Sequence, residues 1–477
     1  MAHRGIRRRD FMKQCGAGLL SVGAGSCVRG QAGGSAVERP NIVFILVDDL
    51  GWADVGCYGN RFNEAPHIDR LAADGMRFTD AYAAAPVCSP TRVSIMSGQY
   101  PARVGVTDFI PGHQRPWAKL TVPRNRQQYL PLEIETVAER LKTAGYACAM
   151  LGKWHLGGRE YFPDRQGFDE MLVSNGRHFG FGTMPKTDIP EDAYLAEFLT
   201  ERAEGFMEAH RNEPFFLYLS HFAVHIPLDA RKALIEKYEN KPKPPGGINN
   251  PVYAAMVEHV DNSVGRIVAK LDELGLQERT LVCFMSDNGG LRCRFDGDGP
   301  LVTSNAPLRD EKGTLYEGGI REPLIFRWPG QIKAGVTCAT PVSSVDFYPT
   351  FLDAAGAAAP ANQPLDGVSV MPLLRRRGAF ERDALFWHYP HYHHSTPASA
   401  VREGDWKLIE FFEDGHVELY NVRDDIGETR DWSGDKPQIA ARLQRMLAEW
   451  RERVSADMPE PNPDYDLARA GEWLQRG

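Results

Sequence analysis

Several features that mark large classes of protein are absent from this sequence of 477 residues. The formal net charge is −8 and no block of lysine and arginine stands out beyond the first residues, so the chain offers no basic field for nucleic acid. After the N-terminal segment, no stretch is long and apolar enough to span a membrane. The length exceeds what one small core needs and favours a large domain plus a smaller one.

Cysteine is scarce, and two of the eight cysteines, Cys15 and Cys27, lie in the N-terminal segment. Cys148 and Cys283 lie within apolar runs and are expected to be buried thiols, although a bridge between Cys283 and Cys293 is an alternative. The spacing of the other six fits neither a zinc motif nor a dense disulfide framework. These six are Cys57, Cys88, Cys148, Cys283, Cys293 and Cys338.

The first 35 residues are typical of a targeting segment and are not expected to join the fold. The run R-R-R-D-F-M-K, from Arg7 to Lys13, precedes a weakly apolar stretch and resembles a twin-arginine export signal. The pattern predicts an exported protein, periplasmic or extracellular, with a disordered basic tail as the alternative. Cys27 is a candidate for a lipid anchor, although the residues before it fit a lipobox poorly.

Short apolar runs alternate with segments of helical spacing in the first three quarters of the chain. The runs predict buried parallel strands at residues 41–47, 146–151, 215–219, 281–285 and 323–326. Helices are expected at 136–144, 195–211 and 253–275. This alternation indicates an α/β fold with a large, mainly parallel central sheet flanked by helices.

The pattern changes after a boundary region near residues 357–364. Residues 400–411 and 417–421 flank the turn E-D-G and predict an antiparallel hairpin, and a helix is expected at 439–454. The Pro-rich stretch 458–464 is expected to lie irregularly on the surface. We therefore expect an α/β domain over residues 36–355 and a smaller C-terminal α+β subdomain, an antiparallel sheet plus a helix, over 356–477.

Polar residues follow four of the predicted strands directly. In open α/β sheets, ligands bind just outside the carboxyl ends of the strands, so these residues are expected to converge on one site. They are Asp48 and Asp49, Lys153 and His155, His221 and His225, and Asp287 and Asn288.

Three carboxylates and one amide in this set could bind a metal ion. Asp48, Asp49, Asp287 and Asn288 suit a hard cation that prefers oxygen ligands, with Ca²⁺ as first choice and Mg²⁺ as second. Zinc would call for histidine or cysteine at several of these places. An Asp-Asp pair alone is more often a helix cap or a solvated turn, but two such strand ends in one chain favour a metal site.

The same region supplies cations that could bind an anion. Arg92, Lys153 and Lys312 would lie near His155 and His225 if the strands converge. Each lysine or arginine alone would be read as a solvated surface charge. Gathered around a divalent cation, they would clamp a tetrahedral dianion such as sulfate or phosphate.

The pentapeptide C-S-P-T-R, from Cys88 to Arg92, would by itself indicate a structural cysteine on a turn. It occurs, however, in order with V-D-D-L-G-W, G-K-W-H-L-G, V-H-I-P, S-D-N-G-G and K-G-T-L-Y-E-G-G-I-R. Over residues 40–433 the chain therefore resembles the type I, formylglycine-dependent sulfatases of the alkaline phosphatase superfamily. Two mild departures are Ser97, where threonine is usual, and Val224, where proline is common.

The resemblance implies a cofactor chemistry centred on Cys88. A formylglycine-generating enzyme would oxidise Cys88 during maturation, and a hydroxyl of the hydrated aldehyde would attack sulfur. The modified Cys88 would also be a ligand of the calcium ion, which would orient the sulfate and lower the pKa of the attacking hydroxyl. The other implied calcium ligands are Asp48, Asp49, Asp287 and Asn288.

The resemblance also implies roles for the surrounding cations and histidines. His225, with Lys312, would protonate or stabilise the leaving alkoxide. His155 would take a proton from the second hydroxyl and so release sulfate. Arg92 and Lys153 would hold the formylglycine and the transferring group.

Clues to the substrate are fewer. Arg177 and His178 lie where such enzymes often place a pocket loop, and His393 lies in the unusual run F-W-H-Y-P-H-Y-H-H. These residues are expected to contact the substrate, with a packed aromatic loop as the alternative for the run. A sulfated carbohydrate is the expected substrate. The alternatives are a phosphomonoester or phosphonate hydrolase of the same superfamily and a non-catalytic sulfoglycan-binding protein.

Overall fold

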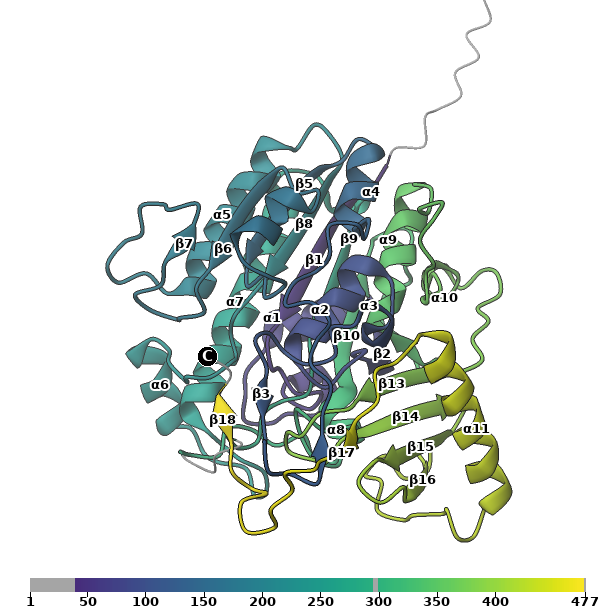
Figure 1. Ribbon diagram of the computed structural model, residues 1–477. Coiled ribbons are helices and arrows are strands. Elements are labelled where there is room, and N and C mark those ends of the chain that lie inside the picture. The colour runs from purple at the N-terminus through teal and green to yellow at the C-terminus, as the bar shows by residue number, and fades with distance from the viewer. Residues whose placement is uncertain (1–38, 295–298, 476–477) are drawn as a thin grey trace, which may run out of the picture. The chain divides into compact units, whose positions relative to one another are not determined.

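The computed structural model describes residues 39–294 and 299–475, which include a ten-stranded sheet (Figure 1). The strand order is β11-β2-β10-β9-β1-β8-β5-β6-β7, with β12 paired to β2. The strands are β1 (Asn41–Val47), β2 (Met76–Tyr82), β5 (Ala147–Gly152), β6 (Glu170–Ser174), β7 (Thr183–Met184), β8 (Phe215–Ser220), β9 (Thr280–Ser286), β10 (Arg321–Arg327), β11 (Val336–Cys338) and β12 (Val342–Ser343).

The centre of this sheet is parallel, as expected for strands that are apolar on both faces. Strands β9, β1, β8, β5 and β6 run parallel to one another, and four of the predicted strands are confirmed among them. The mixed α/β class with a mainly parallel sheet is thereby confirmed.

The expectation that residues 323–326 form a parallel strand is wrong. They form part of β10, which runs antiparallel to both β9 and β2. After β9 the chain stays at the carboxyl edge of the sheet, where Gly289 N–H donates to the Gly319 carbonyl oxygen at 3.1 Å. Among the described residues of this connection the short helix α8 (Glu317–Ile320) alone is helical, and it does not carry the chain back across the sheet, so the next strand runs in the opposite direction.

Helices cover both faces of the sheet, because alternate residues of each strand point to opposite sides. On one face, Val43 and Ile45 of β1 belong to an apolar cluster with α1, α5 and α7. On the other, Ile42 and Phe44 belong to a cluster with α2, α4 and α9. The helices are α1 (Pro66–Ala73), α2 (Cys88–Ser97), α3 (Pro101–Val104), α4 (Val137–Thr143), α5 (Leu195–Ala209), α6 (Lys232–Glu239), α7 (Pro251–Glu273), α8 (Glu317–Ile320), α9 (Phe347–Ala355), α10 (Met371–Arg375) and α11 (Pro437–Arg453).

The three predicted helices of this region are present as α4, α5 and α7. Helix α7 starts two residues earlier than expected, at Pro251. Asn250 caps it, with its side-chain oxygen accepting from the N–H groups of Val252 (3.0 Å) and Tyr253 (3.2 Å). Proline suits the first turn of a helix because its missing N–H would have no partner there, so Pro251 is the first residue of α7.

A four-stranded antiparallel sheet follows, in the order β13-β14-β15-β16, and α11 packs on it (Figure 1). Its strands are β13 (Leu385–Tyr389), β14 (Ala398–Glu403), β15 (Trp406–Phe411) and β16 (Val417–Asn421). The expected hairpin is β15–β16. Treating residues 400–411 as one strand is wrong, because Gly404 (φ 58°) turns the chain between β14 and β15.

The C-terminal stretch is less irregular than expected. Short strand β17 (Glu460–Pro461) pairs with β4 (Leu120–Thr121), and β18 (Leu474–Gln475) pairs with β3 (His113–Gln114). The predicted export signal, residues 1–35, and the candidate anchor Cys27 lie outside the described residues and stay predictions. Within the described ranges, no helix has the length and apolar composition needed to cross a bilayer.

Two cysteine predictions have different outcomes. Cys148 and Cys283 are fully buried, as expected. The bridge between Cys283 and Cys293 is wrong, because both thiols are free. Cys283 points into the core from within β9, whereas Cys293 lies in the loop beyond the end of that strand.

A buried ionic network joins the small sheet to the large one. The Lys407 ammonium on β15 lies 2.9 Å from Glu317 Oε1 on α8 and 2.9 Å from Glu428 Oε1, and none of the three side chains is exposed. Burial raises the pKa of Glu317. The Lys407 ammonium group and then the Arg321 and Arg402 guanidinium groups lower it by more, so the pKa falls to about 2. Glu317 is therefore held as a carboxylate that needs its cations.

Lys407→Met is expected to lower the free energy of unfolding by about 3–5 kcal/mol, since it leaves buried carboxylates without their ammonium partner. Urea denaturation of the two proteins measures the difference. The matched control is Lys436→Met at an exposed position, which should stay within about 0.5 kcal/mol of wild type. Equal effects of the two substitutions would contradict a stabilising role for the network.

Candidate active site

The four polar strand ends lie side by side at one edge of the large sheet. Leu46 of β1 is in register with Ser220 of β8, and Ser220 with Gly152 of β5. On the other side of β1, Val47 is in register with Ser286 of β9. The residues that follow these positions therefore start from one row, and the structure brings the predicted set together.

Local backbone geometry turns these side chains inward. Asp49 (φ 62°) and His155 (φ 58°) both have left-handed backbone conformations, which are uncommon for residues other than glycine. Gly152 (φ 118°) precedes Lys153, and a Cβ there would lie 1.8 Å from the Ser220 carbonyl oxygen. Only glycine lets β5 and β8 approach this closely at the strand end.

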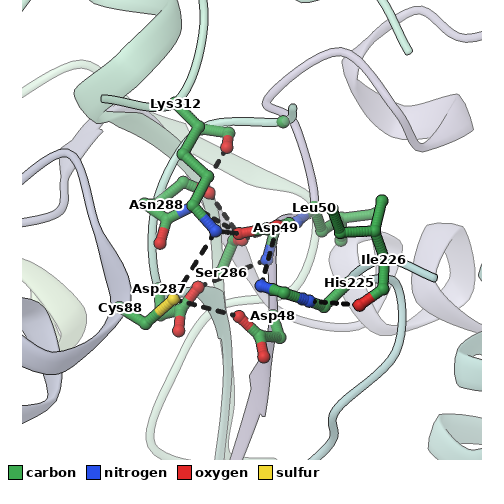
Figure 2. A network of polar contacts seen from close by, with 12 residues as sticks. Asp48, Asp49, Leu50, Cys88, His225, Ile226, Ser286, Asp287, Asn288 and Lys312 are labelled. Carbon is green, nitrogen blue, oxygen red and sulfur yellow. Dashed lines mark hydrogen bonds and ion pairs between the residues drawn. The ribbon is translucent and has the colours of Figure 1, made fainter. Parts of the chain in front are cut away.

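Cys88 is the first residue of α2 and is 2% exposed. Its Sγ lies 3.5 Å from Asp48 Oδ1 and 3.6 Å from Lys312 Nζ (Figure 2). Burial raises the pKa of the thiol, but the Lys153 and Lys312 ammonium groups outweigh burial and hold the pKa well below its ordinary value. Cys88 thus lies in the electropositive setting that distinguishes a chemically active cysteine from a packing residue.

Arg92 lies one turn further along α2 and is fully buried. Its Nε and Nη2 donate to Asp287 Oδ2 at 2.9 and 2.8 Å, and its Nη1 donates to the Lys153 carbonyl oxygen (2.7 Å) and to Ser220 Oγ (2.6 Å). One guanidinium group therefore ties the ends of β9, β5 and β8 to the helix that carries Cys88. The structure places Arg92 behind the site, with these protein groups as its partners.

Two lysines pair with the two adjacent aspartates of β1. Lys153 Nζ lies 2.5 Å from Asp48 Oδ2, and Lys312 Nζ lies 2.6 Å from Asp49 Oδ1. Burial lowers the pKa of each lysine, but its paired aspartate and the Cys88 side chain together raise it above the ordinary value. Burial raises the pKa of Asp49, but Lys312, His225 and Lys153 together lower it below the ordinary value. Lys153, Lys312 and Asp49 are therefore held charged at neutral pH.

Two buried oxygens beside these pairs have no hydrogen-bond partner: Asp49 Oδ2 and Asn288 Oδ1. Asn288 Nδ2 donates to Asp49 Oδ1 at 2.8 Å, which leaves the amide oxygen facing away from that bond. Orphaned buried acceptors beside a carboxylate cluster are what a bound cation would satisfy, and oxygen donors suit a hard divalent ion. Ligand atoms within 4.8 Å of one another are offered by Asp48, Asp49, Cys88 and His225.

Two histidines flank the cluster with opposite proton arrangements. His155 Nε2 lies 2.6 Å from the Ile110 carbonyl oxygen and must donate to it, so the lone pair is on Nδ1, and the ring interacts with the Cys88 side chain. His225 Nδ1 donates to the Ile226 carbonyl oxygen at 2.6 Å, and its Nε2 lies 3.6 Å from Asp49 Oδ2 (Figure 2).

The pKa values of these histidines move in opposite directions. Burial and the Lys153 ammonium lower the pKa of His155, which favours the neutral imidazole. Burial also lowers the pKa of His225, but the Asp49 and Asp48 carboxylates together raise it above the ordinary value. Titratable groups whose environments push their pKa values apart are suited to separate acid and base roles.

The cluster opens into a cavity of about 210 Å³. Of the predicted residues, Cys88, His155, His225, Lys312 and His393 line it. Sequence reasoning missed four further lining residues, although Ile226 lies within the motif V-H-I-P and Leu291 and Arg294 lie close to S-D-N-G-G. The four are Phe109, Ile226, Leu291 and Arg294.

Two predicted substrate contacts lie elsewhere. His178 is 2% exposed, and its Nε2 donates to the His225 carbonyl oxygen at 2.9 Å while its ring packs against Phe222. It therefore supports the loop that carries His225 from behind. Arg177 is exposed at the surface, and the lining of the cavity does not include it.

Two family models match the chain over long ranges. The model of the sulfatase family matches residues 40–357, more than half of the chain. A second model, described as the C-terminal region of N-sulphoglucosamine sulphohydrolase, matches residues 310–453. The chain belongs to the sulfatase family. It is a sulfuric ester hydrolase of the alkaline phosphatase superfamily.

Individual relatives resemble this sulfatase over most of their length. It is 36% identical to human arylsulfatase A over 420 residues, covering 80% of this chain and 77% of that one. It is 33% identical to N-acetylgalactosamine-6-sulfatase of Mus musculus over 397 residues, covering 78% and 72%. The crystal structure of Ps i-CgsB in complex with k-i-k-neocarrahexaose superposes with a TM-score of 0.75 at 29% identity, covering 90% and 96%.

Proposed function

We propose that this sulfatase hydrolyses a sulfate ester of a sulfated carbohydrate, using a formylglycine made from Cys88 and a calcium ion beside it. The observation that carries the proposal is the position of Cys88. Its Sγ lies on the cavity, within 3.6 Å of both a carboxylate oxygen and an ammonium group. A packing cysteine has no use for charged neighbours of both signs.

Conversion of Cys88 would supply an aldehyde whose hydrate carries two hydroxyls, one to attack sulfur and one to help release the sulfate. A thiol has no second hydroxyl. The motif C-S-P-T-R supports this conversion, because it is the pattern on which the resemblance to formylglycine-dependent sulfatases rests. A formylglycine-generating enzyme is then a partner of the nascent chain.

Calcium would be held by the oxygens that now lack partners and by the carboxylates around them. It would supply positive charge at the sulfate oxygens and at the attacking hydroxyl. Asp49 Oδ2 and Asn288 Oδ1, which have no hydrogen-bond partner, support a cation here. The four strand-end ligands are three carboxylates and one amide, and such oxygen ligands favour calcium over zinc. The proposed ligands are Asp48, Asp49, Asp287, Asn288 and the converted Cys88.

The two lysines would bind the sulfate group. Both are buried and held charged, and Lys312 Nζ is already within 3.6 Å of Cys88 Sγ. With a cation on the aspartates, each ammonium group would be free to turn one of its three donors to a sulfate oxygen. Arg92 would act as a positioning residue, since its donors hold Asp287 and the Lys153 backbone.

The histidines would divide the proton transfers between them. His155 presents an unprotonated Nδ1 and a lowered pKa, which suits a base that takes a proton from a hydroxyl at position 88. His225 has a raised pKa and presents Nε2, which suits an acid that protonates the departing alkoxide. Both line the cavity, so both reach a group bound there.

A sugar is the substrate that the cavity supports best. The site is small, and Phe109 with Ile226 and Leu291 gives it apolar walls, while Arg294 and His393 add polar contacts. A sugar ring combines apolar faces with polar edges and matches such a lining. Two relatives, named for an acetylgalactosamine sulfatase and for a complex with a carrahexaose, also support a carbohydrate.

Converted protein is expected to yield a peptide spanning Cys88 that is about 18 Da lighter than the cysteine form. Cys88→Ala should then lower kcat for an aryl sulfate by roughly 10⁴-fold or more, because it removes the nucleophile. Cys338→Ala, at a partly buried cysteine that does not line the cavity, is the control and should retain activity. Full activity of Cys88→Ala would rule out the formylglycine mechanism.

Calcium is expected to raise the melting temperature of chelator-treated protein, because a ligand at 100 times its Kd stabilises the folded state by about 2.7 kcal/mol. Magnesium should raise it less. Asn288→Leu removes the orphaned oxygen and should abolish most of the shift, whereas Asn240→Leu at the exposed end of α6 should keep it. A calcium shift unchanged in Asn288→Leu would remove Asn288 from the ligand set.

With converted protein, kcat/KM is expected to be higher for aryl sulfate than for aryl phosphate, and sulfated oligosaccharides should release sulfate. The measurement is ion chromatography of released anion across a panel of sulfated and phosphorylated sugars. Faster turnover of the phosphates would favour the phosphohydrolase alternative. Binding of sulfated glycans with no turnover would favour a glycan-binding protein.

A further inference from the structure

A second group of metal-binding side chains lies behind the wall of the cavity, apart from the strand-end cluster. It consists of Cys293 in the loop after β9, Glu311 in the segment before α8, and His394 in the loop after β13. One ligand atom from each lies within 4.8 Å of the others. Cys293 Sγ is 3.4 Å from Glu311 Oε1, close to the separation of about 3.6 Å that tetrahedral zinc bonds to sulfur and oxygen would give.

The imidazole of His394 is already oriented as a metal ligand. Its Nδ1 lies 2.8 Å from the Lys312 carbonyl oxygen, which can only accept, so Nδ1 carries the proton. The lone pair is therefore on Nε2, and this atom is buried without a hydrogen-bond partner. Histidines that bind metals in proteins are commonly held in this way, by donating their other N–H to a backbone carbonyl.

The carboxylate of Glu311 is also fixed from behind. Glu311 is 4% exposed, and its Oε2 accepts from the backbone N–H groups of Arg292 (2.6 Å) and Cys293 (2.9 Å). Its other oxygen, Oε1, accepts a hydrogen bond from the Cys293 thiol at 3.4 Å. Replacing that thiol proton with a cation would keep Glu311 Oε1 and Cys293 Sγ as ligands and release the proton to solvent.

We propose that Cys293, Glu311 and His394 form a zinc site that fixes the wall of the catalytic cavity. One sulfur, one imidazole nitrogen and one carboxylate oxygen are zinc ligands, and water would complete the tetrahedron. The strand-end cluster adds the Asp48 and Asp49 carboxylates to a thiol and an imidazole, which favours a hard cation there, whereas this group has a single carboxylate.

Each ligand lies next to a residue that lines the cavity. Cys293 precedes Arg294, Glu311 precedes Lys312, and His394 follows His393. Gly313 (φ 82°) allows the close packing of these segments, since a Cβ there would lie 2.0 Å from His393 Nδ1. A bound ion would thus join three segments of the chain, two of them 18 residues apart and the third in the C-terminal region, and set the positions of three side chains that line the cavity.

The test uses full-length protein in a Cys88→Ser background, which removes the thiol of the strand-end cluster, with calcium present to occupy that cluster. After dialysis against zinc, elemental analysis is expected to find one zinc per chain. Cobalt is expected to give a thiolate-to-cobalt charge-transfer band. Adding Cys293→Ser should abolish the band and reduce the bound zinc to none, whereas adding Cys338→Ser should change neither.

Peptide mapping of the unmutated protein provides a second measurement that needs no variant at this site. Zinc is expected to slow alkylation of Cys293 at least tenfold and to leave alkylation of Cys57 and Cys338 unchanged. Zinc content that is equal with and without Cys293→Ser, no charge-transfer band, or alkylation of Cys293 at the same rate with zinc would each overturn the proposal.

Discussion

The buried pairing of Arg92 with Asp287 is the interaction on which the site depends. The guanidinium group reaches the ends of three parallel strands from one turn of α2, and the same helix begins with Cys88. Because the charges are fully buried, the pairing is intolerant of partial loss: removing either partner would leave a charge in the interior. The position of Cys88 relative to the strand ends therefore follows from a bond network whose members do not touch the cavity.

Charge balance explains how a protein with a net charge of −8 can bind an anion. Three buried carboxylates face three buried cations, so the site is close to neutral without a metal. A divalent ion would make the site positive in a low-dielectric setting, where the attraction for a sulfate ester is strong. The small sheet also supports the position of Lys312. Lys407 of β15 pairs with Glu317 of α8, which follows Lys312 closely in the chain. The three buried carboxylates of the site are Asp48, Asp49 and Asp287, and its three buried cations are Arg92, Lys153 and Lys312.

The sequence predicted the centre of the sheet because strands buried on both faces appear as continuous apolar runs, as β1 and β8 do. It did not predict β2, whose pattern M-R-F-T-D-A-Y is broken by polar residues, nor the direction of β10, since an apolar run carries no direction. The strand-end residues were recognisable because they follow strands directly. Phe109 was not, since it reaches the cavity from an irregular loop. The trio around Cys293 was equally hidden, because its members share no local spacing and meet only in the folded chain.

All ten residues of α2, from Cys88 to Ser97, are buried in the folded protein. An enzyme that must grip the segment C-S-P-T-R in order to oxidise its cysteine cannot reach it there. Under the proposed mechanism, conversion is open only while the chain is still unfolded, and a molecule that folds first is closed to later repair. The active fraction of any preparation then equals the fraction of chains that were converted before they folded. Turnover per total protein would report the maturation capacity of the host as much as the chemistry of the site.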